Sequence, residues 1–130
     1  MPAHTDSDIS VHFVEADVFH TGDTFWNYPF IDYSMGGSID GQIRAAEANI
    51  AKVTDKTIVI PGHGAVGNKA DLILFRDALA DAREKVATMK KQGHSLTEVI
   101  AAKPTARTDE EWGNGFMTPA LFLQWVYQGV

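Results

Sequence analysis

The sequence predicts one α/β (α+β) domain spanning residues 1–130, in which short strands alternate with longer amphipathic helices. Runs of alternating or β-branched residues, which are typical of strands, occur at 10–19 and 57–60. Apolar residues recur at steps of three and four over 39–53 and 68–93, which is typical of helices packed on one face. A chain of 130 residues that is 45% hydrophobic can bury one core, and no repeat or linker divides it.

Two short, adjacent strands are expected first, at 10–15 and 16–19, followed by the turn-like residues 20–23. A loop rich in aromatic residues and glycine covers 24–37, and Ser38 is a good N-cap for a helix. The apolar stripe of that helix consists of Ile39, Ile43, Ala46, Ile50 and Val53. Residues 57–60 then read as a buried strand that stops in a tight loop at 61–64.

The rest of the chain is expected to be helical, apart from a loop at 104–115. A long helix starts near Asn68 and stops at Gly93. Its apolar stripe consists of Leu72, Phe75, Leu79, Ala82, Val86 and Met89. A short helix is expected at 95–102, and Thr118 with Pro119 starts a last helix that runs through Tyr127. The predicted order is strand, strand, helix, strand, helix, helix, helix.

Composition restricts the function. The formal net charge of −6 argues against a nucleic-acid surface, which needs a basic cluster. The chain has no cysteine, so a metal site must use histidine and carboxylate ligands. Residues 1–10 lack the pattern of a signal peptide, and no apolar run approaches the ~18 residues of a membrane span. We therefore expect a cytoplasmic protein with no nucleic-acid or membrane partner.

Three short segments place ligand-type side chains where the backbone turns: Ala3–Asp6, His20–Asp23 and Pro61–Gly64. Imidazole and carboxylate groups bind zinc, manganese or iron, and His4, Asp23 and His63 would leave one position open for water. Each residue also has an ordinary explanation. His4 could belong to a frayed terminus, Asp23 could be a turn or capping residue, and His63 could be a structural loop residue.

Together, these segments resemble the metallo-beta-lactamase superfamily, which includes glyoxalase II-like hydrolases. The resemblance is to the part of the family's sequence that follows its first metal motif. The segment 18–23 (VFHTGD) resembles the family's strand leading to a metal-bridging carboxylate. The segment 58–64 (IVIPGHG) resembles its strand ending in a ligand loop, and His4–Thr5 resembles a further ligand segment. The resemblance covers nearly the whole chain and implies the C-terminal half of the family's αββα sandwich.

The resemblance implies that His4 binds one divalent metal ion, that Asp23 bridges two, and that His63 binds the other. The family's His-x-His-x-Asp-His motif has no counterpart, because the histidines are His4, His12, His20, His63 and His94. His20 is a fourth candidate ligand, although a strand-end histidine more often bonds a loop. His12 is expected to face solvent from its strand. Zinc is the ion we expect, with manganese or iron as alternatives.

The loop after Asp23 contains Trp26, Tyr28 and Asp32, which are candidate substrate contacts, because small-molecule sites are mostly apolar with a few polar groups. The aromatic side chains could equally seal the core beneath the metal loops.

Half of a sandwich would leave one apolar sheet face open, so we expect a homo-oligomer, most simply a dimer about a two-fold axis. The function predicted first is metal-dependent hydrolysis of a small-molecule substrate such as an ester, lactone or phosphodiester. In this reaction a metal-activated water attacks, and Asp23 is the catalytic residue that orients it. The alternatives are a non-catalytic metal-binding or oligomeric remnant of this fold, and an interaction module in which the three residues are structural.

Overall fold

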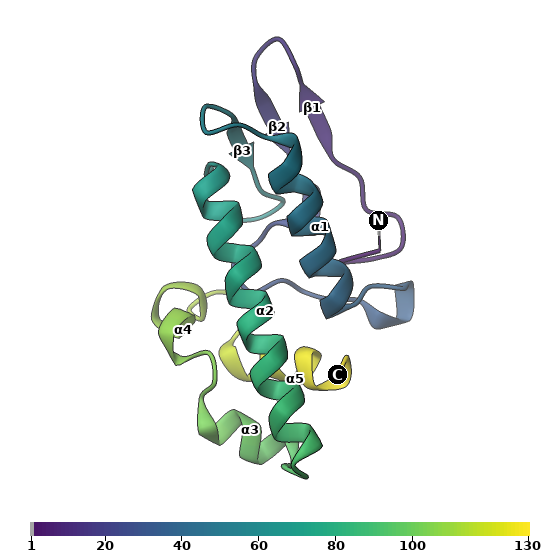
Figure 1. The fold of residues 1–130 in the computed structure, drawn as a ribbon, viewed down its shortest axis with the longest axis vertical. Helices are drawn as coiled ribbons and strands as arrows, with labels where there is room; N and C mark the ends of the chain where they lie inside the picture. The colour runs from purple at the N-terminus through teal and green to yellow at the C-terminus, as the bar shows by residue number, and fades with distance from the viewer. Residues whose placement is uncertain (1) are drawn as a thin grey trace.

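The computed structural model describes residues 2–130, which form a small sheet with helices packed against one of its faces (Figure 1). The strands are β1 (Val11–Phe13), β2 (Val18–His20) and β3 (Ile58–Ile60), in the order β1-β2-β3. Strand β1 pairs with β2 antiparallel, and β2 pairs with β3 parallel. Helix α1 (Ile39–Lys52) lies in the crossover between β2 and β3, which a parallel pair requires.

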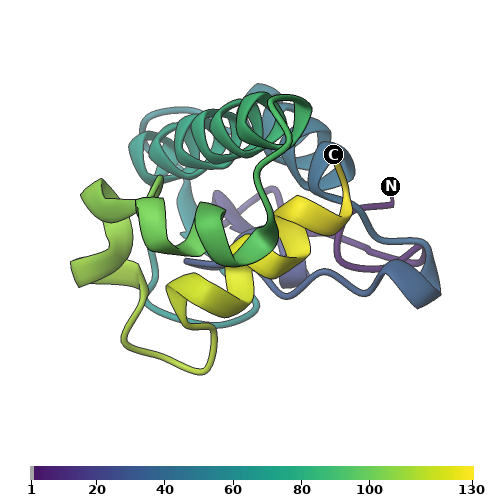
Figure 2. The ribbon, with the colours of Figure 1, turned by 90° about the horizontal axis from the view of Figure 1, so that it is seen from below.

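Four further helices follow β3: α2 (Lys69–Lys91), α3 (Leu96–Ala102), α4 (Ala106–Trp112) and α5 (Pro119–Gln128). Two 3₁₀ turns, η1 (Gly22–Thr24) and η2 (Tyr33–Met35), interrupt the loop before α1. Helices α1 and α2 lie side by side, and α3 and α5 pack against α2 (Figure 2). No helix within residues 2–130 is long and apolar enough to cross a membrane.

The expected helix starts are confirmed by their capping contacts. The Ser38 hydroxyl accepts the Gly41 N–H at 2.9 Å. Asn68 and Asp71 form a reciprocal capping box, and Thr118 caps α5. These contacts are local, which explains why the pattern predicted them well.

The core lies between the sheet and the helices. Phe19 and Val59 point from the sheet toward the helices and are 1% and 0% exposed. Five of the six stripe residues expected in α2 are fully buried, and Met89 is partly buried at its edge. Because side chains alternate along a strand, the neighbours of Phe19 and Val59 must point to the opposite face.

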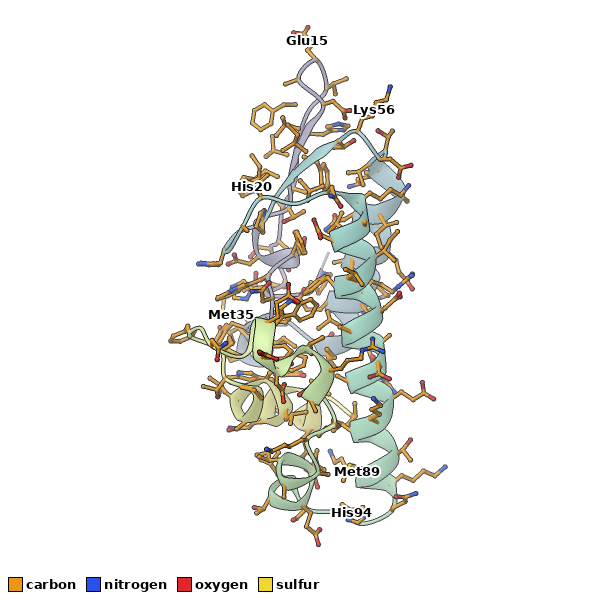
Figure 3. The ribbon with its side chains drawn as sticks, turned by 90° about the vertical axis from the view of Figure 1, so that its left-hand side faces the viewer. Glu15, His20, Met35, Lys56, Met89 and His94 are labelled. Carbon is orange, nitrogen blue, oxygen red and sulfur yellow. The ribbon has the colours of Figure 1, made fainter. Side chains whose placement is uncertain are left out.

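That opposite face is apolar and open. By register it carries Val11, Phe13, Val18, His20, Ile58 and Ile60. Val11, Phe13 and Ile58 are 44%, 55% and 48% exposed. In Figure 3 His20 lies on the side of the sheet away from α1 and α2, and Glu15 marks the hairpin tip. His12 is exposed, as expected from its place in the strand, and its ring also meets Phe19 edge-on at 5.6 Å.

Two element predictions were wrong. Residues 14–17 form a turn instead of strand, with Asp17 at a φ of 51° and its N–H bonded to the Val14 carbonyl. The expected loop at 104–115 contains α4. This helix is held by a residue 81 positions away, since the Tyr28 hydroxyl donates to Asp109 Oδ1 at 2.6 Å. Sequence periodicity carries no signal of such a contact.

Replacing Tyr28 with Phe should lower the free energy of unfolding at neutral pH by about 1–2 kcal/mol, because a buried donor to a carboxylate is lost. Burial and the neighbouring Asp109 raise the pKa of Tyr28 from 10.0 to about 12. A raised pKa favours folding below pH 10, and this contribution disappears as the pH rises through the folded value. Urea unfolding from pH 8 to 12 should therefore show the stability difference between the two proteins narrowing above pH 10, and a constant difference would contradict this assignment.

Candidate functional site

Three side chains from distant parts of the sequence meet beside the sheet. His4 Nε2 lies 3.4 Å from Asp23 Oδ2, and His63 Nε2 lies 3.3 Å from Asp23 Oδ1. The fold thus brings together the three residues that the sequence analysis selected, with one imidazole facing each oxygen of a single carboxylate.

His4 is held by a tightly bonded N-terminal turn. The Asp8 carboxylate accepts the backbone N–H groups of Ala3, His4 and Thr5, and Ala3 is fully buried. The His4 Nδ1 donates to the Phe30 carbonyl at 2.8 Å. Because a carbonyl only accepts, the proton of neutral His4 is on Nδ1, and the Nε2 lone pair faces Asp23. The frayed terminus considered from the sequence is not found, and Asp8 was the signal that could have excluded it.

Asp23 lies in η1, immediately after β2. Gly22 precedes it with a φ of +58°, and a Cβ at this glycine would come within 2.9 Å of the Ile9 carbonyl oxygen. Thr21 is fully buried and donates its hydroxyl to the Gly22 and Ile60 carbonyls. The Gly-Asp pair therefore forms a tight turn at the end of the parallel strands, with the Asp23 side chain 29% exposed.

His63 lies in the loop after β3, which packs directly on the Asp23 turn. The Gly62 N–H donates to the Gly22 carbonyl at 2.8 Å. A Cβ on Gly62 would overlap with Asp23 Oδ1, so only glycine allows this approach. The imidazole of His63 stacks on Trp26, with centroids 4.0 Å apart and planes inclined by 24°. The ring is 54% exposed, and Trp26 restricts its orientation.

The distances between these donor atoms suit a divalent metal ion. Two donors bound at about 2.0–2.2 Å to one tetrahedral ion lie roughly 3.3 Å apart, which matches both His–Asp23 distances. However, the two imidazoles face different carboxylate oxygens. Among residues 2–130, no three His, Cys, Asp or Glu side chains are grouped so that they could hold one ion. Each His–Asp23 pair therefore offers two protein donors.

His20, the fourth candidate ligand, has a different environment. Its Nδ1 accepts the Gly22 N–H at 3.0 Å, which places the proton of the neutral ring on Nε2. Neither nitrogen then keeps a lone pair for an ion. The ring lines a hollow on the open sheet face with Ile9, Val11, Phe13 and Gly22. This geometry favours the loop-bonding role over the ligand role.

The three candidate substrate contacts lie in different surroundings. Trp26 is partly exposed against His63. Tyr28 is 2% exposed and stacks on Phe122 at 4.5 Å, so it belongs to the core. Asp32 caps η2, and hydrogen bonds from Ser34 and the Met35 N–H hold the pKa of its carboxyl below the ordinary value. The Asp32 backbone N–H donates to the His4 carbonyl at 2.9 Å, whereas Trp26 places its side chain against the His63 ring.

A pocket that the sequence did not suggest opens beside the His63 loop. Its volume is about 250 Å³, and it lies between the loop at 65–67 and helices α2 and α4. Its walls include Phe25, Asn27, Leu74, Glu111 and Trp112. Phe25 and Asn27 flank Trp26 in the sequence, so the segment that supports His63 also forms part of this pocket.

Comparisons with known proteins identify the fold. No protein-family model and no curated protein matches the sequence. Solved structures do match, among them the sec-alkylsulfatase Pisa1 from Pseudomonas sp., with a TM-score of 0.75, and a double mutant of this sulfatase, with a TM-score of 0.78. Each is 19% identical and covers 98% of this chain, whereas this chain spans 22% of theirs. The likeness confirms that the chain has the architecture of part of a metallo-beta-lactamase-type fold.

Proposed function

We propose that this chain supplies half of a metal-dependent hydrolase site, and the observation that carries this proposal is the pair of imidazoles facing the two oxygens of Asp23. His4 with Oδ2 would hold one divalent ion, and His63 with Oδ1 the other. Zinc suits imidazole and carboxylate donors best, with manganese or iron as alternatives. His20 lies outside this proposed ligand set, because the Gly22 N–H occupies the lone pair on its Nδ1.

In this proposal a divalent ion supplies Lewis acidity and lowers the pKa of a bound water toward ~7. The protein residues have separate tasks. The Phe30 carbonyl holds His4 in the tautomer whose Nε2 can bind, and Trp26 restricts the His63 ring. Asp23 would orient the attacking water through its carboxylate, which is 29% exposed.

The proposed substrate is a small molecule with a hydrolysable ester, lactone or phosphodiester bond. The 250 Å³ pocket beside the His63 loop is its proposed location, because Phe25 and Trp112 provide apolar walls and Asn27 a polar group. The solved neighbours are sec-alkylsulfatases, which adds sulfate esters to the substrates worth testing. Trp26 remains a proposed contact at the border between pocket and site.

The second candidate function is a non-catalytic metal-binding or oligomeric remnant. It is favoured by one observation, namely that each ion would have two donors from this chain within residues 2–130. Further donors must then come from water, from another part of a longer chain, or from a partner. Turnover distinguishes the two functions, because a remnant would bind metal without hydrolysing any substrate.

We further propose that two copies of the chain associate through the open sheet face. The side chains Val11, Phe13 and Ile58 are about half exposed there, and Ile9 and Val14 extend the apolar surface at 76% and 75%. A sheet with one apolar face buried against helices and the other open is stabilised by a second apolar layer. A symmetric dimer is the simplest source of that layer for identical chains.

Metal binding can be tested with Co²⁺, which replaces Zn²⁺ and is visible by absorption. His63→Ala and Asp23→Asn should each weaken Co²⁺ binding by more than ten-fold, since metal affinity falls about 10- to 100-fold even when only an outer-shell partner is lost. His94→Ala is the control, because His94 lies beyond α2 at the far end of the molecule from the hairpin tip (Figure 3). Equal Co²⁺ affinity in the wild type and the three variants would contradict metal binding at this site.

Hydrolysis assays with the zinc-loaded protein decide between the two candidate functions. Turnover of p-nitrophenyl acetate, p-nitrophenyl sulfate or a p-nitrophenyl phosphodiester would support the hydrolase, and turnover of none of them would support the remnant.

Gly62→Ala should disturb the site while the helices remain intact, because the added Cβ overlaps with the Asp23 carboxylate. We expect the same loss of Co²⁺ affinity, at least ten-fold, with an unchanged helical circular dichroism spectrum. Gly115→Ala is the matched control, since a Cβ at Gly115 meets no atom within 4 Å. Wild-type affinity in Gly62→Ala would show that the close approach of the two loops is irrelevant to binding.

If two copies associate through the open sheet face, sedimentation equilibrium should give the mass of a dimer. Phe13→Lys should shift the protein to monomer, because it places a charge on the open face, where Phe13 is 55% exposed. Leu74→Lys is the control, as Leu74 is similarly exposed, at 61%, but lies on α2. A well-folded wild-type monomer at micromolar concentration would rule out the dimer.

A further inference from the structure

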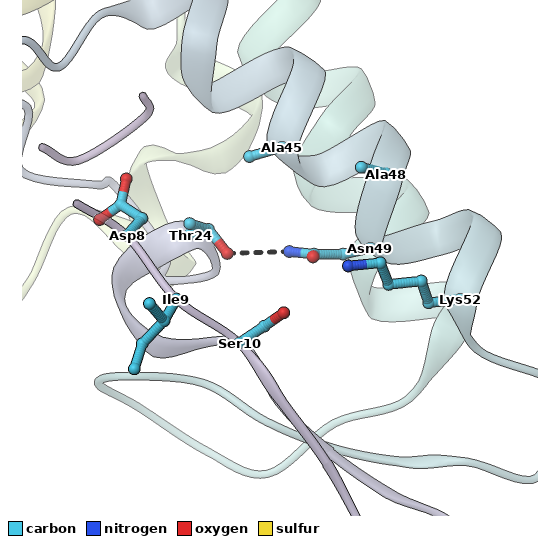
Figure 4. Close-up of a pocket in the computed structure, with 8 residues that line it drawn as sticks. All are labelled: Asp8, Ile9, Ser10, Thr24, Ala45, Ala48, Asn49 and Lys52. Carbon is cyan, nitrogen blue, oxygen red and sulfur yellow. Dashed lines mark hydrogen bonds between the residues drawn. The ribbon is translucent and has the colours of Figure 1, made fainter. Parts of the chain in front are cut away.

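Helix α1 directs two buried amide side chains at the turn that carries Asp23. Gln42 and Asn49 are 0% and 5% exposed and are seven residues apart, which is two helical turns, so they lie on one face of the helix. Gln42 Nε2 donates to the Asp23 carbonyl at 3.2 Å. Asn49 Nδ2 donates to Thr24 Oγ1 at 2.8 Å, as Figure 4 shows. Neither residue belongs to the apolar stripe that the sequence predicts for this helix.

The Thr24 hydroxyl connects Asn49 to the start of the turn. It donates to the Thr21 carbonyl at 2.8 Å, and Thr24 is 5% exposed. Thr21 makes no side-chain capping bond to this three-residue 3₁₀ segment, and Asp23 has non-helical dihedral angles inside it. Backbone groups on both sides of the Asp23 carboxylate are thus fixed from α1, one through Gln42 directly and one through Asn49 and Thr24.

Stability alone does not account for Gln42. Its Oε1 is buried and has no hydrogen-bond partner among the described residues. A buried carbonyl-type oxygen without a partner destabilises the folded state. Exchanging the amide oxygen and nitrogen would not help, because the oxygen would then face the Asp23 carbonyl. An apolar side chain of the same length would fill this space without burying an unbonded oxygen.

We propose that Gln42 is a positioning residue for Asp23, assisted by Asn49. By holding the Asp23 carbonyl, Gln42 fixes the backbone from which the carboxylate extends toward His4 and His63. The metal-binding test of this role rests on the proposed function. A second test, on the protein without metal, rests only on the contacts of Asp23 with His4 and His63. Gln42 therefore fixes the Asp23 turn while its unbonded Oε1 lowers the stability of the core.

The test replaces Gln42 with Met, which has a similar length and no polar oxygen. Co²⁺ affinity should fall about ten-fold, as is common when an outer-shell partner of a ligand is lost, while the melting temperature stays the same or rises. Gln124→Met is the matched control, because Gln124 is exposed on α5. A purely structural Gln42 would give the opposite result, a lower melting temperature with wild-type affinity. A variant that fails to fold would also overturn the inference, since the buried Oε1 is argued to destabilise the fold.

A second measurement needs no metal. The imidazole ¹⁵N and ¹H signals of His4 and His63 in the apo protein report their contacts with Asp23, and both should move in Gln42→Met but not in Gln124→Met. If wild-type protein binds no Co²⁺ while these signals move, the proposed function fails and the positioning role stands. Unmoved signals would overturn the positioning role whatever the metal result.

Discussion

The site depends on the contact between two loops at the end of the parallel strands. The Gly62 N–H donates to the Gly22 carbonyl, and Gly62 lies directly against the Asp23 carboxylate. Because β2 and β3 run parallel, their carboxyl ends meet at the same edge of the sheet and deliver Asp23 and His63 together. Any side chain at Gly62 would separate them. The glycine is therefore as much a part of the site as the two polar residues it brings together.

The open sheet face gives this small fold its other constraint. Three strands covered by helices on one side leave Val11, Phe13 and Ile58 about half exposed on the other. The solved neighbours are several times longer, since this chain spans 22% of them, and the likeness extends over 98% of this chain. The grouping of only two imidazoles around the Asp23 carboxylate and the uncovered face thus point in the same direction. Both features are expected of one half of an αββα sandwich when the other half is not present.

Much of the fold could be predicted from the sequence, because its signals are local. Ser38, Asn68 and Thr118 cap helices through contacts within three residues, and the stripe of α2 follows directly from its periodicity. The resemblance also placed His4, Asp23 and His63 in one site. The predictions failed where a distant partner decides the structure: Asp109 bonds Tyr28 and stabilises α4 within an expected loop, and residues 14–17 turn at Asp17 instead of extending the strands.

The sequence by itself determined which segments become helices and strands and which residues are capable of binding a metal. Only the tertiary structure decided how those residues are used. The Phe30 carbonyl leaves the His4 Nε2 lone pair free, whereas the Gly22 N–H occupies the lone pair of His20 on Nδ1. Gln42 reaches the Asp23 carbonyl from 19 residues away. Protonation and positioning depend on hydrogen bonds between distant backbone groups, and such bonds leave no periodic trace in a sequence.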